Sequence, residues 1–413
     1  MKNKKAFFIL VLILIPIIIF TGCWDKMELE EDGYVAAIGV DEGNGNNVNI
    51  TFQIINPKAG GNGTTGVSGG NGKRDDIISI ESPGILMARD LVSATITRKI
   101  SLSHSKIVIV GEKFAKTDKF FHLIEAALRD KEMRRSMTIM ITREEAAQFI
   151  RNNNPILEER PQKFYEFMSK RWKDTGFVPP FSNLNRFMQR TEQGESLFLI
   201  TYGTTRDVID KTEKEVPNFL PGQLKKESKN STEIIGAAVF KKGIMIGKLT
   251  GAEVRITSLL RRKPEVNYML MTFKDPLDKD SFISTRVVKQ KNTLIKINVN
   301  GTHPKIYVTV PISLDILGIA GFTDYPENLN NQQILKKSIE DSLQEEAINL
   351  IKKTQNDFEG EPFLWELAAR GQFLTYDTYK NYEWMKKYKD AEIAVKFNVT
   401  IRDFGKQLNP PDM

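Results

Sequence analysis

A single cysteine sets the strongest limit on how this chain can fold. Cys23 is the only cysteine among 413 residues, so no disulfide can form within one chain. Each domain must therefore be held by a hydrophobic core, and 40% of the residues are hydrophobic, enough to build one. The position of Cys23 is a second limit, because it directly follows a short apolar segment.

The N-terminus has the order of an export signal. Three lysines among the first five residues are followed by the apolar run 6–20 and by small residues just before Cys23. A positive start, an apolar stretch and a small-residue cleavage site are typical of a secretory signal peptide. The run is shorter than the roughly 20 residues that a membrane-spanning helix needs, and Pro16 disfavours a straight helix. We therefore predict a lipoprotein signal peptide at 1–22.

The residues before Cys23 resemble a bacterial lipobox, in which the thiol receives a diacylglyceryl group before cleavage. We predict that Cys23 becomes an N-palmitoyl and S-diacylglycerol cysteine. Each buried methylene contributes about 0.8 kcal/mol, so two or more chains anchor a protein stably where one does not. Phe20 stands where lipoboxes most often carry Leu. An uncleaved signal anchor with an idle thiol is the alternative.

The remaining 391 residues are long enough for two or three domains. We predict an N-terminal α/β-type domain at 23–202, with space for two subdomains. The segment 203–230 is polar and contains two prolines, so we interpret it as a linker or bridge. A C-terminal α+β domain is predicted at 231–405, with a long helix at 332–354. The expected fold class is α+β and multi-domain, with mixed or antiparallel sheets and packed helices.

Strand and helix patterns alternate in the first half. Strands are expected at 34–40, 47–55, 77–80, 106–110, 136–141 and 196–201, and helices at 85–97, 120–128, 164–172 and 184–188. Thr142-Arg143-Glu144-Glu145 is interpreted as a capping box for a helix ending at Ile150, and Asp118 as another N-cap. The glycine-rich tract 58–73 should be a long surface loop between two paired strands.

The second half begins with a predicted hairpin. Its strands, 233–240 and 244–249, flank Lys241-Lys242-Gly243, and Thr250-Gly251-Ala252-Glu253 is a second capping box. Further strands are expected at 266–273, 282–289, 293–300, 305–314 and 391–401, and shorter helices at 363–369 and 378–388. The long helix carries an apolar stripe, which should cover a sheet: Leu335, Ile339, Leu343, Ala347 and Ile351.

No pattern predicts catalytic, cofactor-binding or metal-binding residues. The letters of Gly61-Asn62-Gly63-Thr64-Thr65-Gly66 match a dinucleotide-binding motif, but no strand-to-helix turn surrounds them. The three histidines, His104, His122 and His303, fall in different predicted elements. Adjacent carboxylates at 30–31, 144–145 and 158–159 diverge on a helix and are interpreted as solvated.

Charge gives two further expectations. The net charge of +7 falls to +4 without the signal-peptide lysines and is dispersed, so we do not expect nucleic acid as a partner. The dense run Arg129-Asp130-Lys131-Glu132-Met133-Arg134-Arg135 can be a solvated turn, a contact surface, or an ion-paired turn that fixes a helix against a strand.

Several short motifs together resemble the Ger(x)C family of spore-germination lipoproteins. Those in the first half are Cys23-Trp24-Asp25, Glu28-Leu29, Ala37-Ile38-Gly39-Val40-Asp41, Ser103-His104, Gly111-Glu112, Ala115 and Leu128-Arg129-Asp130 with Glu132 and Arg134. Those in the second half are Gly236-Ala237-Ala238-Val239-Phe240, Gly247-Lys248-Leu249-Thr250, Glu253, Trp384 and the closing strand to Gly405. Their order and spacing extend over nearly the whole mature chain.

This resemblance implies a non-catalytic subunit of a nutrient germinant receptor. Such a subunit is held by lipid on the outer face of the inner spore membrane, beside integral membrane A and B type subunits. Cys23 alone carries over as a functional position, and no catalytic residue or cofactor does. Two other functions stay open on the residues alone: a tethered cell-wall-active enzyme, and a free-standing solute-binding lipoprotein.

Overall fold

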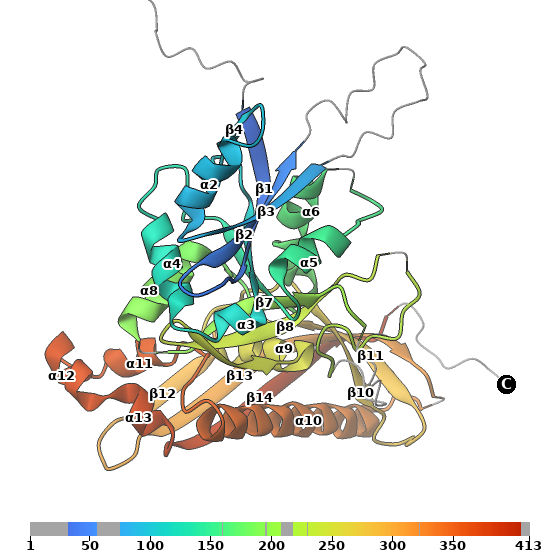
Figure 1. Cartoon of the computed structure of the whole chain (residues 1–413). Helices are drawn as coiled ribbons and strands as arrows, with labels where there is room; N and C mark the ends of the chain where they lie inside the picture. Colours follow the sequence, from blue (N-terminus) through green and yellow to red (C-terminus); the bar gives the residue numbers. More distant parts are fainter. Residues whose placement is uncertain are drawn as a thin grey trace, which may run out of the picture.

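A computed structural model describes residues 32–55, 75–158, 160–194, 196–207, 218–228, 230–321 and 323–405 (Figure 1). The predicted signal peptide, Cys23, the carboxylate pair at 30–31 and the glycine-rich tract 58–73, with its dinucleotide-like letters, lie outside the described residues. Two mixed sheets with packed helices confirm the α+β class.

The first sheet is built around β1, which begins at the first described residue. Its order is β3-β2-β1-β5-β6-β7-β8-β9, with β4 paired to the start of β1. The strands are β1 (Asp32–Glu42), β2 (Val48–Ile55), β3 (Asp75–Ser82), β4 (Lys99–Ser101), β5 (Ile107–Gly111), β6 (Thr138–Thr142), β7 (Phe198–Thr204), β8 (Glu233–Lys241) and β9 (Ile244–Leu249). β1, β5, β6 and β7 run parallel, and the outer strands are antiparallel to their neighbours.

Helices cover both faces of this sheet, which explains the nearly continuous apolar sequence of its parallel strands. On one face, α2 (Ile85–Ser93), α3 (Glu112–Ala115), α4 (Lys119–Ala127) and α8 (Leu184–Gln193) share a core with Ile38 and Val108. On the other face, α5 (Ala146–Asn152) and α6 (Pro161–Met168) pack with Ala37 and Ile107. Successive strand residues thus enter different cores, as the period of a strand requires.

The second sheet is covered on one face only. Its strands are β10 (Met269–Lys274), β11 (Phe282–Val288), β12 (Leu294–Asn298), β13 (Lys305–Ile319) and β14 (Glu392–Asp403), and they alternate buried and exposed residues. The associated helices are α9 (Gly251–Leu260), α10 (Leu329–Asn356), α11 (Glu366–Arg370), α12 (Tyr376–Tyr382) and α13 (Trp384–Tyr388). The apolar stripe of α10 is entirely buried, which confirms the prediction.

The hairpin β8–β9 belongs to both cores. Its turn is confirmed, with positive φ at Lys242 and Gly243. Although we expected this hairpin to open the C-terminal domain, it completes the edge of the first sheet. Ala238 and Phe240 join the first core, whereas Ala237 and Val239 join the core of the second sheet. The two faces of β8 therefore contact different cores, so this strand takes part in the packing of both sheets.

Local capping was predicted correctly at one helix and wrongly at another. The capping box of α9 is formed in both directions by Thr250 and Glu253. At α5, the predicted box at 142–145 does not form, because the helix begins later, at Ala146 with Glu145 as its N-cap residue, and the hydroxyl of Thr142 donates to the carbonyl of Glu144 instead. Asp118 precedes α4 as predicted, but its side chain makes no capping hydrogen bond.

Several predicted helices differ in extent from those observed. The helix expected at 85–97 ends at Ser93. The patterns at 164–172 and 378–388 each break into two helices: α6 with α7 (Trp172–Thr175), and α12 with α13. Glu383, between α12 and α13, has a φ of 54°, which a continuous helix cannot contain.

Candidate functional site

Asp41, next to the last residue of β1, caps the N-terminus of α5. Its two carboxylate oxygens accept hydrogen bonds from the amides of Ala146 (2.7 Å) and Ala147 (2.9 Å). The side chain is 3% exposed, and burial raises the pKa of Asp41 to about 6 despite these two bonds. Gly111, at the end of β5, lies so close that a β-carbon there would collide with the carboxylate.

Asp41 lies in a polar cleft of about 320 Å³ at the carboxyl ends of β1, β5 and β6. In parallel sheets, ligands frequently bind at this edge. Here the buried carboxylates are occupied internally: Asp41 holds α5, and Glu144 binds Thr204 and Thr205. Since these groups are satisfied by the fold itself, we assign them a structural role.

The histidines remain separate, as the sequence predicted. His104 is exposed and packs edge-on against Tyr34, at 4.7 Å between ring centres. His122 is exposed beside Glu125, and His303 is exposed in a turn. Among the residues that the structure describes, no group of three His, Cys, Asp or Glu side chains could hold a metal ion.

The charge run after α4 is an ion-paired turn, one of its three possible interpretations. Arg89 of α2 lies 3.4 Å from Asp130 and 3.9 Å from Glu132. Glu132 also accepts the amide of Leu102 at 2.8 Å. The acidic members of the run thus join α2, α4 and the segment before β5, while the neighbouring basic side chains, such as Arg129, are exposed.

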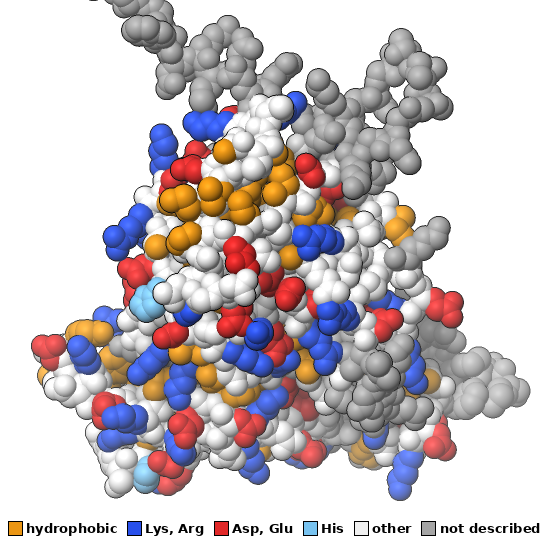
Figure 2. Space-filling view, viewed as in Figure 1, with side chains coloured by type: hydrophobic (Ala, Val, Ile, Leu, Met, Phe, Trp, Pro, Cys, Tyr) orange, Lys and Arg blue, Asp and Glu red, His pale blue; other side chains and the backbone are white. Residues whose placement is uncertain are grey.

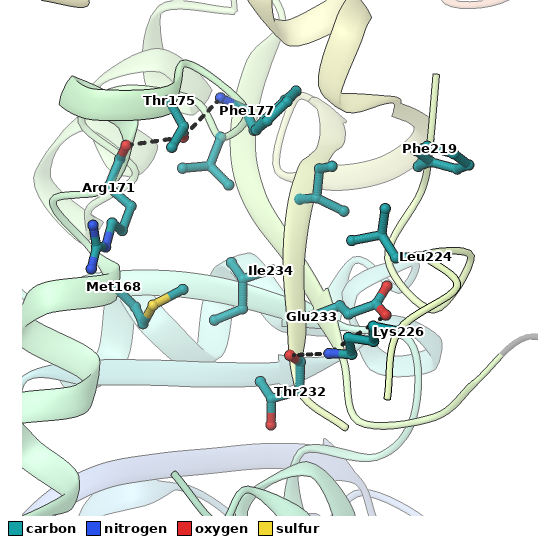
Figure 3. A pocket seen from close by; sticks show the side chains of 12 residues that line it. Met168, Arg171, Thr175, Phe177, Phe219, Leu224, Lys226, Thr232, Glu233 and Ile234 are labelled. Carbon is teal, nitrogen blue, oxygen red and sulfur yellow. Dashed lines mark hydrogen bonds and ion pairs between the residues drawn. The ribbon is translucent and has the colours of Figure 1, made fainter. Parts of the chain in front are cut away.

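A largely apolar hollow of about 490 Å³ lies where α6 and α7 meet the start of β8 (Figure 3). It is lined by Met168, Arg171, Thr175, Phe177, Val178, Phe219, Leu224, Lys226, Thr232, Glu233, Ile234 and Ile235. Small-molecule sites in proteins are typically concave, mostly apolar and of roughly this size. No local sequence pattern predicts this site, because its three lining segments are remote from one another in the sequence.

The polar groups of the hollow stand on opposite sides, with Arg171 on one side and Glu233 with Lys226 on the other (Figure 3). Glu233 is 4% exposed, and one of its carboxylate oxygens accepts the amide of Gly222. The other oxygen has no hydrogen-bond donor and lies 3.5 Å from the ammonium of Lys226. That ammonium donates to the carbonyls of Ser231 and Thr232.

The predicted attachment residue Cys23 lies nine positions before Asp32, outside the described residues. Asp32 begins β1, and strand pairing brings the end of β2 and the start of β3 to the same end of the sheet. Near it, Figure 2 shows hydrophobic side chains over α2 and β3, where Met87 and Leu91 are exposed. No helix in the described ranges is both long and apolar enough to cross a membrane.

Comparison with known proteins gives matches on both halves of the chain. The family model described as the spore germination protein N-terminal domain matches residues 25–205. The model described as spore germination B3/GerAC-like, C-terminal, matches residues 235–405. These limits fall near the predicted domain boundaries at 23–202 and 231–405.

Relatives from Bacillus subtilis (strain 168) align along nearly the entire chain. Spore germination protein KC is 26% identical over 409 residues, covering 97% of this chain and 96% of the relative. Spore germination protein B3 is 19% identical over 418 residues, covering 98% and 99%. The crystal structure of the GerBC protein matches with a TM-score of 0.54 and 17% identity, over 88% of this chain and 96% of that one. At this identity the structural likeness shows the fold alone. Family models on both halves and relatives of full length establish that the chain belongs to the Ger(x)C family of spore germination proteins.

Proposed function

We propose that this chain is a non-catalytic lipoprotein subunit of a nutrient germinant receptor and is required for spore germination. Acylated Cys23 holds it on the outer face of the inner spore membrane, beside integral membrane A and B type subunits. The observation that carries the proposal is the pair of family matches, which begin two residues after Cys23 and end at residue 405.

The site chemistry supports a role in assembly rather than in bond cleavage. The buried carboxylates at the ends of the parallel strands are engaged by the fold, as shown for Asp41 and Glu144. A general acid and base need free, opposed groups with separated pKa values. No grouping among the described side chains favours the tethered-enzyme alternative, whereas the apolar hollow leaves a solute-binding role to be tested.

Membrane attachment is tested by replacing Cys23 with Ala. Without the thiol no diacylglyceryl group can be attached, so the variant should leave the membrane fraction of spores and nutrient germination should slow. Mass spectrometry of the mature N-terminal peptide should find acylated cysteine in the wild type only. Phe20→Leu, which brings the lipobox closer to its common pattern, serves as the matched control and should remain membrane-bound. Unchanged membrane retention of the Cys23 variant would overturn the anchor.

Receptor membership is tested separately, by affinity purification from cross-linked spore membranes. We expect two integral membrane proteins to co-purify with the wild-type chain, one of them polytopic. Recovery of the acylated chain without either partner would contradict the receptor assignment while leaving the anchor intact. Cleavage of cortex peptidoglycan by the purified chain would instead support the enzyme alternative.

A further inference from the structure

The charge run after α4 lies at the same edge of the first sheet as the start of β1. Because β1, β5 and β6 are parallel, their first residues share one edge. The turn at 129–137 leads directly into β6, and the chain toward Cys23 leaves from the first residue of β1. The amide of Leu102, the residue after β4, donates to Glu132 in this turn at 2.8 Å. The turn is therefore joined to the part of the sheet from which the predicted tether leaves.

The distance between the turn and the start of the tether is short. β4 pairs with the first three residues of β1, and Lys99 lies directly opposite Asp32. Leu102 follows β4, so it lies about three residues, roughly 10 Å, along β1 from Asp32. The nine positions from Cys23 to Asp32 can span at most about 30 Å. Lipid attached to Cys23 would therefore keep this edge of the sheet within reach of the bilayer surface.

The acidic side chains of the run point inward and are engaged by the protein itself. Asp130 and Glu132 lie 3.4 and 3.9 Å from the guanidinium of Arg89, and their side chains are only 19% and 24% exposed. Asp130 also accepts the amide of Glu132 at 2.8 Å. The acids that begin β3, Asp75 and Asp76, lie on the other side of β1, beyond β2. Little negative charge thus reaches the outer surface of the turn.

The basic side chains of the same edge face solvent. Lys131, Arg134 and Arg135 are exposed, as is Lys99 beside the start of β1. None of these four side chains forms an ion pair or a hydrogen bond with any residue that the structure describes. Figure 2 shows Lys and Arg side chains at this end of the molecule. We call the surface formed by these four residues the basic edge.

We infer that the basic edge binds the headgroups of anionic phospholipids in the membrane to which the chain is attached. The inference rests on the lipid anchor proposed above and adds a second contact to it. Each Lys or Arg close to an anionic bilayer strengthens the attraction about fivefold. Since the tether already supplies attachment, four such charges need only orient the domain. The amino edge of the first sheet would then face the bilayer, with the second sheet away from it (Figure 1).

The test uses the mature acylated chain in two kinds of lipid nanodisc. One is made of phosphatidylcholine, which is neutral, and the other of equal parts phosphatidylcholine and phosphatidylglycerol, which is anionic. Hydrogen exchange followed by mass spectrometry reports on the turn at 129–137 and on β4. We expect slower exchange there in anionic discs than in neutral ones. High salt should abolish the difference, because it screens charges over a few ångströms.

Removal of the charges tests the assignment to these residues. The combined change Lys131→Gln, Arg134→Gln and Arg135→Gln leaves Cys23 and the inward acids unaltered. It should shift the docking equilibrium on the order of a hundredfold toward the undocked state, so anionic discs should no longer slow exchange. A matched control changes three exposed lysines of α10 and β14 to Gln and should keep the protection: Lys336, Lys352 and Lys396.

Circular dichroism melting checks that both variants fold as the wild type does. The inference is overturned if an acylated wild-type chain exchanges equally in neutral and anionic discs. It also fails if the first variant retains the protection or if the control loses it. Mass spectrometry of the N-terminal peptide separates the two proposals. A peptide without acyl groups would contradict the anchor and this inference together, whereas an acylated chain without protection would contradict this inference alone.

Discussion

Asp41 has a structural role that its neighbours in the sequence do not predict. Its carboxylate holds the first two amides of α5, although it lies on β1 more than a hundred residues earlier. An acidic residue near the end of a buried strand indicates a hydrogen-bonded carboxylate, because the cost of burying the charge must be offset by hydrogen bonds. The sequence could have identified Asp41 as unusual, but not its partner.

The raised pKa of Asp41 makes stability depend on pH in a defined direction. The folded-state pKa of about 6 exceeds the ordinary value of 3.8, so between about pH 4 and 6 the folded chain binds the proton more tightly. The contribution of Asp41 therefore favours folding at low pH and is lost as pH rises through 6, with a total of at most about 3 kcal/mol.

Urea unfolding between these pH values checks this expectation. Asp41→Asn should remove the corresponding slope from the free energy of unfolding, while Asp76→Asn, at an exposed position on β3, is the control and should keep it. Equal slopes in the wild type and Asp41→Asn would show that the carboxyl group does not titrate in this range.

Gly111 should be intolerant of alanine because of Asp41. A β-carbon at Gly111 would overlap the carboxylate, so Gly111→Ala should lower the free energy of unfolding by about 1–3 kcal/mol. The cost should shrink when Asp41 is already replaced by Ala, and a double-mutant cycle measures that coupling. Gly371→Ala, where the nearest atom would be 3.5 Å away, is the control. An equal cost at Gly111 with or without Asp41 would rule out the steric explanation.

At the level of elements, the sequence predicted local features well and long-range ones poorly. The capping box of α9 depends on four consecutive residues only, and the structure contains it as predicted. The stripe of α10 repeats at four-residue intervals and is buried. By contrast, the four residues before α5 have the same letters as a capping box, yet the first amides of α5 are bound by Asp41 on β1 instead. Tertiary contacts outcompeted the local pattern there.

The contribution of the α9 cap to stability can be measured by changing Thr250. Thr250→Ala removes the hydroxyl that accepts the amide of Glu253 and should cost about 1 kcal/mol in the free energy of unfolding. Thr250→Ser keeps the hydroxyl and should cost much less. Chemical denaturation of both variants compares them directly, and equal losses would mean that the methyl group, not the cap, stabilises this end of α9.

Across the whole molecule, the two sheets are joined by more than their shared hairpin. Arg190 of α8 forms a 2.5 Å ion pair with Glu366 of α11, and the side chain of Glu366 is 1% exposed. Glu361 lies beside this pair, accepts the amides of Phe363 and Glu366, and has its pKa raised by burial. The two halves therefore meet at a buried charged contact as well as in a continuous core. The sequence indicated neither contact; it predicted only that a linker or bridge at 203–230 joins the halves.

Breaking this contact should lower the free energy of unfolding. Arg190→Ala leaves the carboxylate of Glu366 buried without its cation and should cost roughly 3–5 kcal/mol. Adding Glu366→Gln should restore much of that loss, because the stranded charge is then removed. Arg186→Ala, an exposed change four residues earlier on α8, is the control. Equilibrium unfolding followed by fluorescence measures all four chains, and a negligible loss in Arg190→Ala would exclude a stabilising role for the pair.

The position of β1 has a mechanical consequence. β1 is hydrogen-bonded to β2 on one side and to β5 on the other, and the chain leading to Cys23 leaves from its first residue. Tension applied through the N-terminus would load both ladders in shear, so many bonds would have to break together. An edge strand would peel away one bond at a time. If Cys23 carries the lipid anchor proposed above, force on that anchor would reach the sheet through both ladders of β1.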